Sequence, residues 1–183
     1  MQLLDAANYV LRTLGERPVS TLDLNHPTLA VVIPELELKR KTLLLRGWWF
    51  NHRNVTVLPN MAKEFVVPTG LAHTVEYPYY VLDGKVFDPE RETFTISKDK
   101  LKVLTTFDVD FEKMPEVAAC VVQFEAAISA YCHDIGLEST VQLWQQESSR
   151  AYALLEREHL RNMKYNTRQS GAAARILTAM RGI

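Results

Sequence analysis

The hydrophobic pattern of this chain changes its period twice, and this constrains the fold more than any other feature of the sequence. Apolar residues recur at helical spacing in the N-terminal part and again after residue 114. Between residues 48 and 111 they fall into short β-branched and aromatic runs, which prolines and glycines separate. The sequence therefore predicts helices at both ends and an inserted β segment, which together make an α+β domain.

Residues 1–47 are predicted to form a helical hairpin. The first helix ends before Gly15, and its apolar stripe consists of Leu3, Ala7, Val10 and Leu14. The second helix begins near Pro27, because a proline in the first turn loses no needed hydrogen bond. Its apolar phase continues across Pro34, which predicts one kinked helix that ends at Gly47.

Residues 48–112 are predicted to form a small, mostly antiparallel β lobe of about four to six strands. Asp83-Gly84 between two apolar runs is typical of a two-residue hairpin turn. The runs "TFTI" (93–96) and "LKVLTTF" (101–107) are also predicted to be strands, and the polar "SKDK" is the turn between them.

Residues 113–164 are predicted to form a second helical hairpin. A heptad-like stripe marks its first helix, which stops before Gly136; the stripe is Val117, Val121, Phe124, Ile128, Tyr131 and Ile135. The inward residues of its second helix, from about 139 to 163, are Val141, Trp144, Ser148, Ala151 and Leu155. Residues 165–183 form a C-terminal arm. The predicted fold is thus a four-helix bundle-like core of two hairpins, with an inserted antiparallel β lobe and this arm.

The composition is that of an ordinary soluble domain. The net charge of −1 predicts no general attraction to nucleic acid or to anionic lipid. The N-terminal segment lacks a basic region and carries Asp5 within its apolar stretch, which argues against a secretory signal. No apolar run is long enough to span a membrane. Two cysteines without CxxC spacing predict neither a disulfide framework nor a metal site.

The candidate catalytic groups do not form a recognisable active site. Cys120 and His133 lie on nearly opposite faces of one predicted helix, which excludes a catalytic dyad within that helix. The five histidines show no metal-binding spacing. The acidic pairs at 90 and 92 and at 108 and 110 are equally expected on a solvated β surface. No catalytic residue, metal or cofactor is predicted, although a glycosidase-like carboxylate pair remains an alternative.

The stretch "LLRGWWFNHR" (44–53) places two tryptophans and a phenylalanine directly after a glycine. In an extended segment Trp48 and Phe50 would share one face and Trp49 would take the other, so three coplanar stacking rings are not expected. We predict that this stretch joins the helices to the β lobe. Gly47, Trp48, Phe50 and Asn51 form the joint, with Asn51 capping the turn, and Trp49 is free to contact another subunit.

Charge is distributed unevenly along the C-terminal half. Residues 114–149 contain acids but no lysine or arginine. Residues 150–183 are basic, and their cations are Arg150, Arg157, Arg161, Lys164, Arg168, Arg175 and Arg181. A basic, weakly apolar extension of this kind often orders only against a partner.

Several short motifs follow one another in an order that resembles the tail tubular protein A family of short-tailed bacteriophages, the head-to-tail adaptors. They are Gly15-Glu16, Pro18-Val19-Ser20-Thr21-Leu22, Gly47-Trp48, Phe50-Asn51, Leu58-Pro59, Met114-Pro115-Glu116 and Tyr165-Asn166. The resemblance covers essentially the whole chain. Trp49 lies outside the match, and Pro34 and the comparatively short β region depart from the family pattern.

The resemblance implies a structural virion protein rather than an enzyme. Such adaptors form a ring, typically of twelve copies, between the portal and a tail nozzle of the tail tubular protein B type. The ring lines the channel through which double-stranded DNA passes without sequence-specific binding during genome ejection. The chain would thus assemble in the host cytoplasm and reside in the phage tail, with no membrane partner.

Two surfaces acquire expected roles from this resemblance. The portal-contact candidates in the C-terminal arm are Arg168, Arg175, Ile176, Leu177 and Arg181. The candidates for lining the lumen, where inward acids would repel DNA, are Glu116, Glu125, Glu138 and Glu147. Two alternatives to the adaptor are a phage-associated polysaccharide or peptidoglycan hydrolase and a helical interaction module with no role in the virion.

Overall fold

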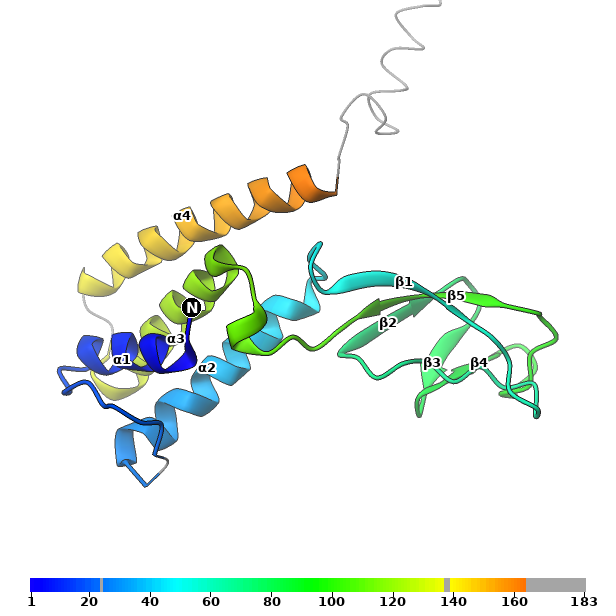
Figure 1. Cartoon of the computed structure of the whole chain (residues 1–183), viewed down its shortest axis with the longest axis horizontal. Helices are drawn as coiled ribbons and strands as arrows, with labels where there is room; N and C mark the ends of the chain where they lie inside the picture. The colour runs from blue at the N-terminus through cyan, green and yellow to red at the C-terminus, as the bar shows by residue number, and fades with distance from the viewer. Residues whose placement is uncertain (24, 137–138, 164–183) are drawn as a thin grey trace, which may run out of the picture.

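The computed structural model describes residues 1–23, 25–136 and 139–163, and these contain four α-helices and two antiparallel sheets (Figure 1). The helices are α1 (Leu3–Thr13), α2 (Pro27–Leu45), α3 (Glu116–Asp134) and α4 (Ser139–Asn162). The strands are β1 (His52–Val57), β2 (Ala72–Val75), β3 (Tyr80–Leu82), β4 (Lys85–Phe87) and β5 (Leu101–Thr106). This order of elements confirms the predicted α+β class.

Helix α3 is the central helix, and α1, α2 and α4 all pack against it. Small side chains allow three neighbours to approach it, and the buried alanines are Ala118, Ala119, Ala126, Ala127 and Ala130. The predicted single stripe was therefore too narrow. Val121 and Tyr131 are buried, but Ile135 is exposed at the end of the helix.

Helix α2 continues unbroken through Pro34, as the persistent apolar phase predicts. It begins with Pro27, and His26 Nδ1 accepts a hydrogen bond from the N–H of Leu29 at 3.4 Å. Leu29, Val32, Leu36 and Leu44 are buried on the face toward the core.

Helix α4 buries four of the five residues predicted to point inward, namely Val141, Ser148, Ala151 and Leu155. The fifth, Trp144, is partly buried and makes an edge-to-face contact with Tyr131 at 5.0 Å between ring centroids.

The β lobe has a hydrophobic core of its own. Strands β1, β5 and β2 form one antiparallel sheet in that order, and β3 and β4 form a separate hairpin. The buried residues of this core are Val57, Phe65, Val67, Val86, Ile96, Leu101 and Val103. The predicted turn is confirmed, since Asp83 and Gly84 have φ angles of 49° and 72°, both in the left-handed region that a type I′ turn requires.

The "TFTI" segment is not a strand, contrary to the prediction. Thr93 pairs with Asp88, and Thr95 pairs with Glu64, each through an isolated bridge. The Asp88 side chain accepts the N–H of Glu90 and closes a tight turn directly before this segment. The segment consequently meets two different neighbours, one residue at a time, and no continuous ladder forms.

Candidate functional site

The two chain segments that connect the helices with the β lobe meet beside the C-terminal half of α2 (Figure 1). We call this region the joint. It comprises residues 46–51, which lead into β1, and residues 107–109, which return from β5. Asn51 within the joint and Arg40 of α2, which bonds to its returning segment, are both buried.

Gly47 ends α2 in a conformation that other residues adopt only with strain. Its φ angle is +75°, and its N–H donates to the carbonyl oxygen of Leu44 at 3.0 Å. A Cβ atom at this position would lie 2.7 Å from Nδ1 of His52. Backbone angle and neighbour therefore both require glycine here.

Trp48 is completely buried in the helical core. Its indole N–H donates to the carbonyl oxygen of Leu43 at 2.8 Å. Its ring meets Tyr152 and His159 edge to face, at centroid distances of 5.8 and 5.4 Å. The ring is thus enclosed by α2 and α4 and presents no stacking surface to solvent.

Asn51 is the polar centre of the joint and is only 1% exposed. Its Oδ1 accepts the N–H of Trp48 at 2.8 Å, which is the turn cap expected from the sequence. Its Nδ2 donates to the carbonyl oxygens of Leu44 at 3.0 Å and Phe107 at 3.1 Å. The N–H of Phe107 in turn donates to the Asn51 carbonyl oxygen at 2.7 Å. One amide therefore ties α2 and both connecting segments together.

Trp49 and Phe50 lie in a turn, whereas the sequence analysis placed them in an extended segment. The N–H of Asn51 donates to the carbonyl oxygen of Trp48 at 3.1 Å and closes this turn. The Trp49 and Phe50 rings contact each other edge to face at 5.1 Å, and both are partly buried. Trp48 alone of the three enters the core.

A buried arginine supplies a second tie at the joint. Arg40 of α2 donates to the carboxylate of Asp108 and to the carbonyl oxygen of Val109 on the returning segment, and to Glu37 at 2.8 Å. Burial lowers the pKa of the Arg40 guanidinium, but hydrogen bonds to Glu37 and Asp108 outweigh it, and the net shift is upward. Asp108 and its neighbour Asp110, which pairs with Lys113, are thus both engaged in ion pairs.

Helix α4 contacts the joint through three side chains on one face, Tyr152, Glu156 and His159. The guanidinium of Arg46 donates to Glu156 at 2.7 Å and to the Tyr152 hydroxyl, and it lies 4.8 Å from the centroid of the Trp48 ring. Tyr152, Glu156 and His159 are four and three residues apart, the spacing of neighbours on one helix face. The sequence analysis did not identify this face.

His159 closes the contact between α4 and the joint. Its Nδ1 accepts the backbone N–H of Trp49 at 3.2 Å. Burial, followed by the charges of Arg46 and His52, lowers the pKa of His159 below the ordinary 6.5, while Glu156 acts in the opposite direction. The neutral imidazole that this hydrogen bond needs is thereby favoured.

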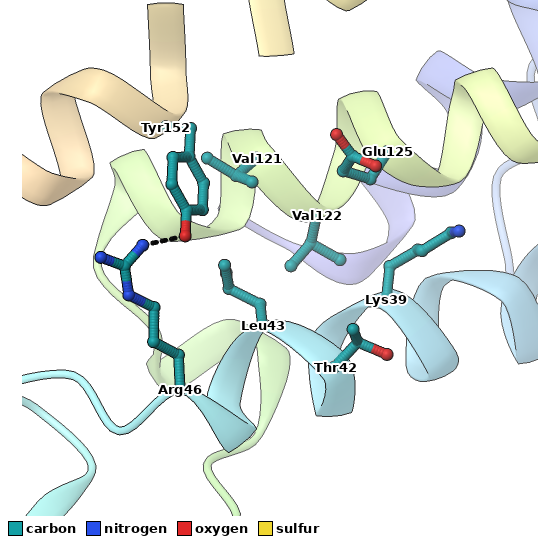
Figure 2. Close-up of a pocket in the computed structure, with 8 residues that line it drawn as sticks. All are labelled: Lys39, Thr42, Leu43, Arg46, Val121, Val122, Glu125 and Tyr152. Atoms are coloured by element: carbon teal, nitrogen blue, oxygen red, sulfur yellow. Dashed lines mark hydrogen bonds between the residues drawn. The ribbon is translucent and has the colours of Figure 1, made fainter. Parts of the chain in front are cut away.

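A small groove lies next to the joint, between α2, α3 and α4 (Figure 2). It has a volume of about 250 Å³, and Leu43, Val121 and Val122 form its apolar part. Lys39, Arg46, Glu125 and Tyr152 stand around it, and Arg46 is already paired with Glu156. The volume is below the roughly 300–1,000 Å³ of small-molecule pockets, so the groove suits an apolar side chain better than a substrate.

Each predicted lumen acid that the structure describes has a polar partner within the subunit. Glu116 lies at the start of α3 and pairs with the N-terminal ammonium group at 2.6 Å. Glu125 accepts the hydroxyl of Ser148 at 2.6 Å, and Glu147 pairs with Arg150 at 2.5 Å. Glu138 lies outside the described residues. So do the portal-contact candidates Arg168, Arg175, Ile176, Leu177 and Arg181.

Among the residues that the structure describes, no helix is both long and apolar enough to cross a membrane. Across residues 1–23, 25–136 and 139–163, no three His, Cys, Asp or Glu side chains are grouped so that they could hold a metal ion.

Comparison with known proteins gives two agreeing results. A family model described as "Tail tubular protein" matches residues 4–165. The chain is also 33% identical over 184 residues to "Tail tubular protein A" of Klebsiella phage KP34, and this similarity covers 98% of each chain.

Proposed function

This chain belongs to the tail tubular protein A family of phage tail proteins, and on that premise we propose that it is a head-to-tail adaptor. It is a structural protein of the virion tail. In the proposed role, twelve copies of the chain form a ring between the portal and the tail nozzle. Double-stranded DNA passes through the ring during genome ejection, and assembly takes place in the host cytoplasm.

The observation that carries this proposal is the double tie at the joint. An adaptor has to hold two different surfaces in one orientation, because one meets the head and the other meets the tail. Asn51 and Arg40 fasten both connecting segments to α2 through buried hydrogen bonds. A hinge would instead be built from exposed, weakly bonded backbone. The joint thus supports a rigid subunit with two distinct ends.

The two ends have different proposed roles. The bundle-like set of four helices and the arm of residues 165–183 engage the portal, where Arg168, Arg175 and Arg181 pair with acidic side chains and Ile176 and Leu177 enter apolar sites. The β lobe faces outward or toward the nozzle. Residues 1–47 and 113–164 act as one body, and residues 48–112 act as the other.

The lumen is proposed to be lined by acids. A ring multiplies every inward charge by its number of copies, so acids there would repel DNA and let it slide. Glu116 and Glu147 are exposed in the single subunit, although each is ion-paired, with the N-terminal ammonium group and with Arg150, and Glu138 is the further candidate. Glu125 is also exposed, although its carboxylate accepts a hydrogen bond from Ser148.

We propose no catalytic role. Asp108 and Asp110 are engaged in ion pairs, and the buried Asp88 accepts backbone N–H groups of its own turn. Burial raises the pKa of the Cys120 thiol, which keeps it protonated and a poor nucleophile. Membership of a family of virion tail proteins also argues against the alternative of a helical interaction module with no role in the virion.

The test is imaging of the full-length chain mixed with portal rings, followed by addition of the nozzle protein. We expect the chain to form a ring on one end of the portal and to be required for nozzle attachment. A truncation after Tyr165 should lose portal affinity while keeping the unfolding temperature of the full chain. Nozzle binding to portal rings without this chain would contradict the proposed adaptor function. Unchanged portal affinity of the truncated chain would contradict the proposed role of the arm.

A further inference from the structure

Two helix faces of the helical part carry exposed apolar residues. On α2 these residues are Val31, Leu38 and Leu45, each between 53% and 59% exposed. They follow one another at intervals of seven, which places them on one side of the helix about 10 Å apart. This α2 face lies opposite the face that buries Leu29 and Leu36.

The second face is the solvent side of α4, where Leu143, Leu154 and Leu160 are between 50% and 61% exposed. Leu143 and Leu154 follow one line along the helix, and Leu160 lies about 120° round the helix from Leu154. Small side chains lie between them, and shallow depressions on this surface are lined by Ser149 on one side and by Ala153 on the other. The depression at Ala153 is also lined by Leu160, Arg157 and Arg161, whereas the exposed apolar residues of α2 follow one line along their helix. Such surfaces interlock when two helices pack.

The two faces point away from each other. Helix α3 lies between α2 and α4 and packs against both (Figure 1). Because the core-facing sides of α2 and α4 are turned toward α3, the exposed sides lie on opposite flanks of the helical part. Within one chain they cannot cover each other.

Their charges are complementary. At the Val31 end of the α2 face lie the exposed acids Glu16 and Asp134, which line a depression together with Val31. At the C-terminal half of the α4 face lie Arg157 and Arg161. Among the described residues, neither these two arginines nor these two acids has an ion-pair partner. Opposite charges thus mark one end of each face.

We propose that the α2 face of one subunit docks on the α4 face of the next, with the two helices antiparallel. This alignment brings Arg157 and Arg161 to Glu16 and Asp134, and it seats Leu38 in the hollow at Ala153. A contact between two different faces of the same chain is heterologous, so it repeats from subunit to subunit and closes into a ring when the rotation permits. The inference rests on the proposed ring and names the surfaces that build it.

The first experiment uses phage particles that carry the full chain with both Leu38→Cys and Ala153→Cys. A short bifunctional maleimide should convert the chain into a ladder of covalent multimers. Particles with only one of the two cysteines, or with only the native Cys120 and Cys132, should give no ladder. Particles in which imaging shows a ring of this chain but cross-linking gives no ladder would overturn the α2–α4 contact and leave the proposed function standing. Particles without such a ring would overturn both.

The second experiment reverses the charges. The double substitution Arg157→Glu and Arg161→Glu should reduce the amount of the chain incorporated into tails at least tenfold. The unfolding temperature of the purified chain should not change. Adding Glu16→Lys and Asp134→Lys to the same chain should restore incorporation. Leu58→Asp is the control, since Leu58 is an exposed apolar residue of the β lobe, and it should be incorporated normally. Full incorporation of the double arginine variant, or no rescue by the lysines, would overturn the proposed pairing.

Discussion

The Asn51 side chain donates a hydrogen bond to the carbonyl oxygen of Phe107, a residue 56 positions later in the chain. The two residues stand where the chain leaves the helices for the β lobe and where it comes back. Their contact makes the geometry at one connecting segment depend on the other. The first predictions concern this dependence.

Replacing Asn51 with alanine should lower the free energy of unfolding by about 2–4 kcal/mol, because three buried backbone partners lose their hydrogen bonds at once. Urea unfolding followed by tryptophan fluorescence measures the change. Asn162→Ala is a matched control, since Asn162 makes one exposed hydrogen bond, and it should cost no more than about 0.5 kcal/mol. Equal effects of the two substitutions would contradict the role of Asn51.

Replacing Trp48 with alanine should cost about 3–5 kcal/mol, since the ring is fully buried between α2 and α4. Trp49→Ala should cost less, because Trp49 is only partly buried. Near-neutral stability of Trp48→Ala, combined with lost binding of a partner, would instead favour a recognition surface at this ring.

Alanine substitutions at Gly47 and Gly15 can separate the cost of backbone strain from the cost of a steric clash. Both have positive φ angles, of 75° and 79°, but no atom lies within 4 Å of a Cβ added at Gly15. Gly15→Ala should therefore cost about 1–2 kcal/mol from backbone strain alone. Gly47→Ala should cost about 1–3 kcal/mol more, because the new Cβ meets the His52 ring. Adding His52→Ala to Gly47→Ala should recover only this additional part, as thermal and urea unfolding of the three variants will show.

Stability should fall on acidification through His159. Its folded-state pKa is below the ordinary 6.5, so the unfolded chain takes up a proton at a higher pH than the folded chain does. This contribution to stability is complete above 6.5 and is lost as the pH falls from there through the folded pKa. Urea unfolding from about pH 8 to about pH 5 should show a smaller decrease for His159→Phe than for the unchanged chain. Identical decreases would rule out His159 as a source of the pH dependence.

Local patterns were sufficient to predict the four helices and the position of the β segment between them. The turn at Asp83-Gly84 and the inward face of α4 depend on neighbouring residues, and both are present in the structure. "TFTI" has strand-like composition, but the tight turn at Asp88 separates it from a continuous partner, and composition does not reveal this. The stripe predicted for α3 was too narrow because a single period cannot show that three helices surround it.

The joint was predicted only in its local half. Asn51 and Trp48 are three residues apart, so a turn cap could be inferred from the sequence. The contact of Arg40 with Asp108 spans 68 positions, and nothing in the sequence marks either residue as the partner of the other. The contact of Trp49 with another subunit stays a prediction, but the hydrogen bond from its backbone N–H to His159 of α4 could not be foreseen. Contacts of this kind follow from tertiary packing and not from periodicity.

The β lobe is attached to the helices through two points that lie side by side and are bonded to each other. Within the lobe, Leu71 also packs against the helical core, so the helical part requires this contact as well as first and last residues that meet at this spacing. A lobe of another length or sequence that keeps these contacts would leave the packing of the helices unchanged. A graft at Asn51 and Phe107 that keeps them would attach a different lobe to the same helical part.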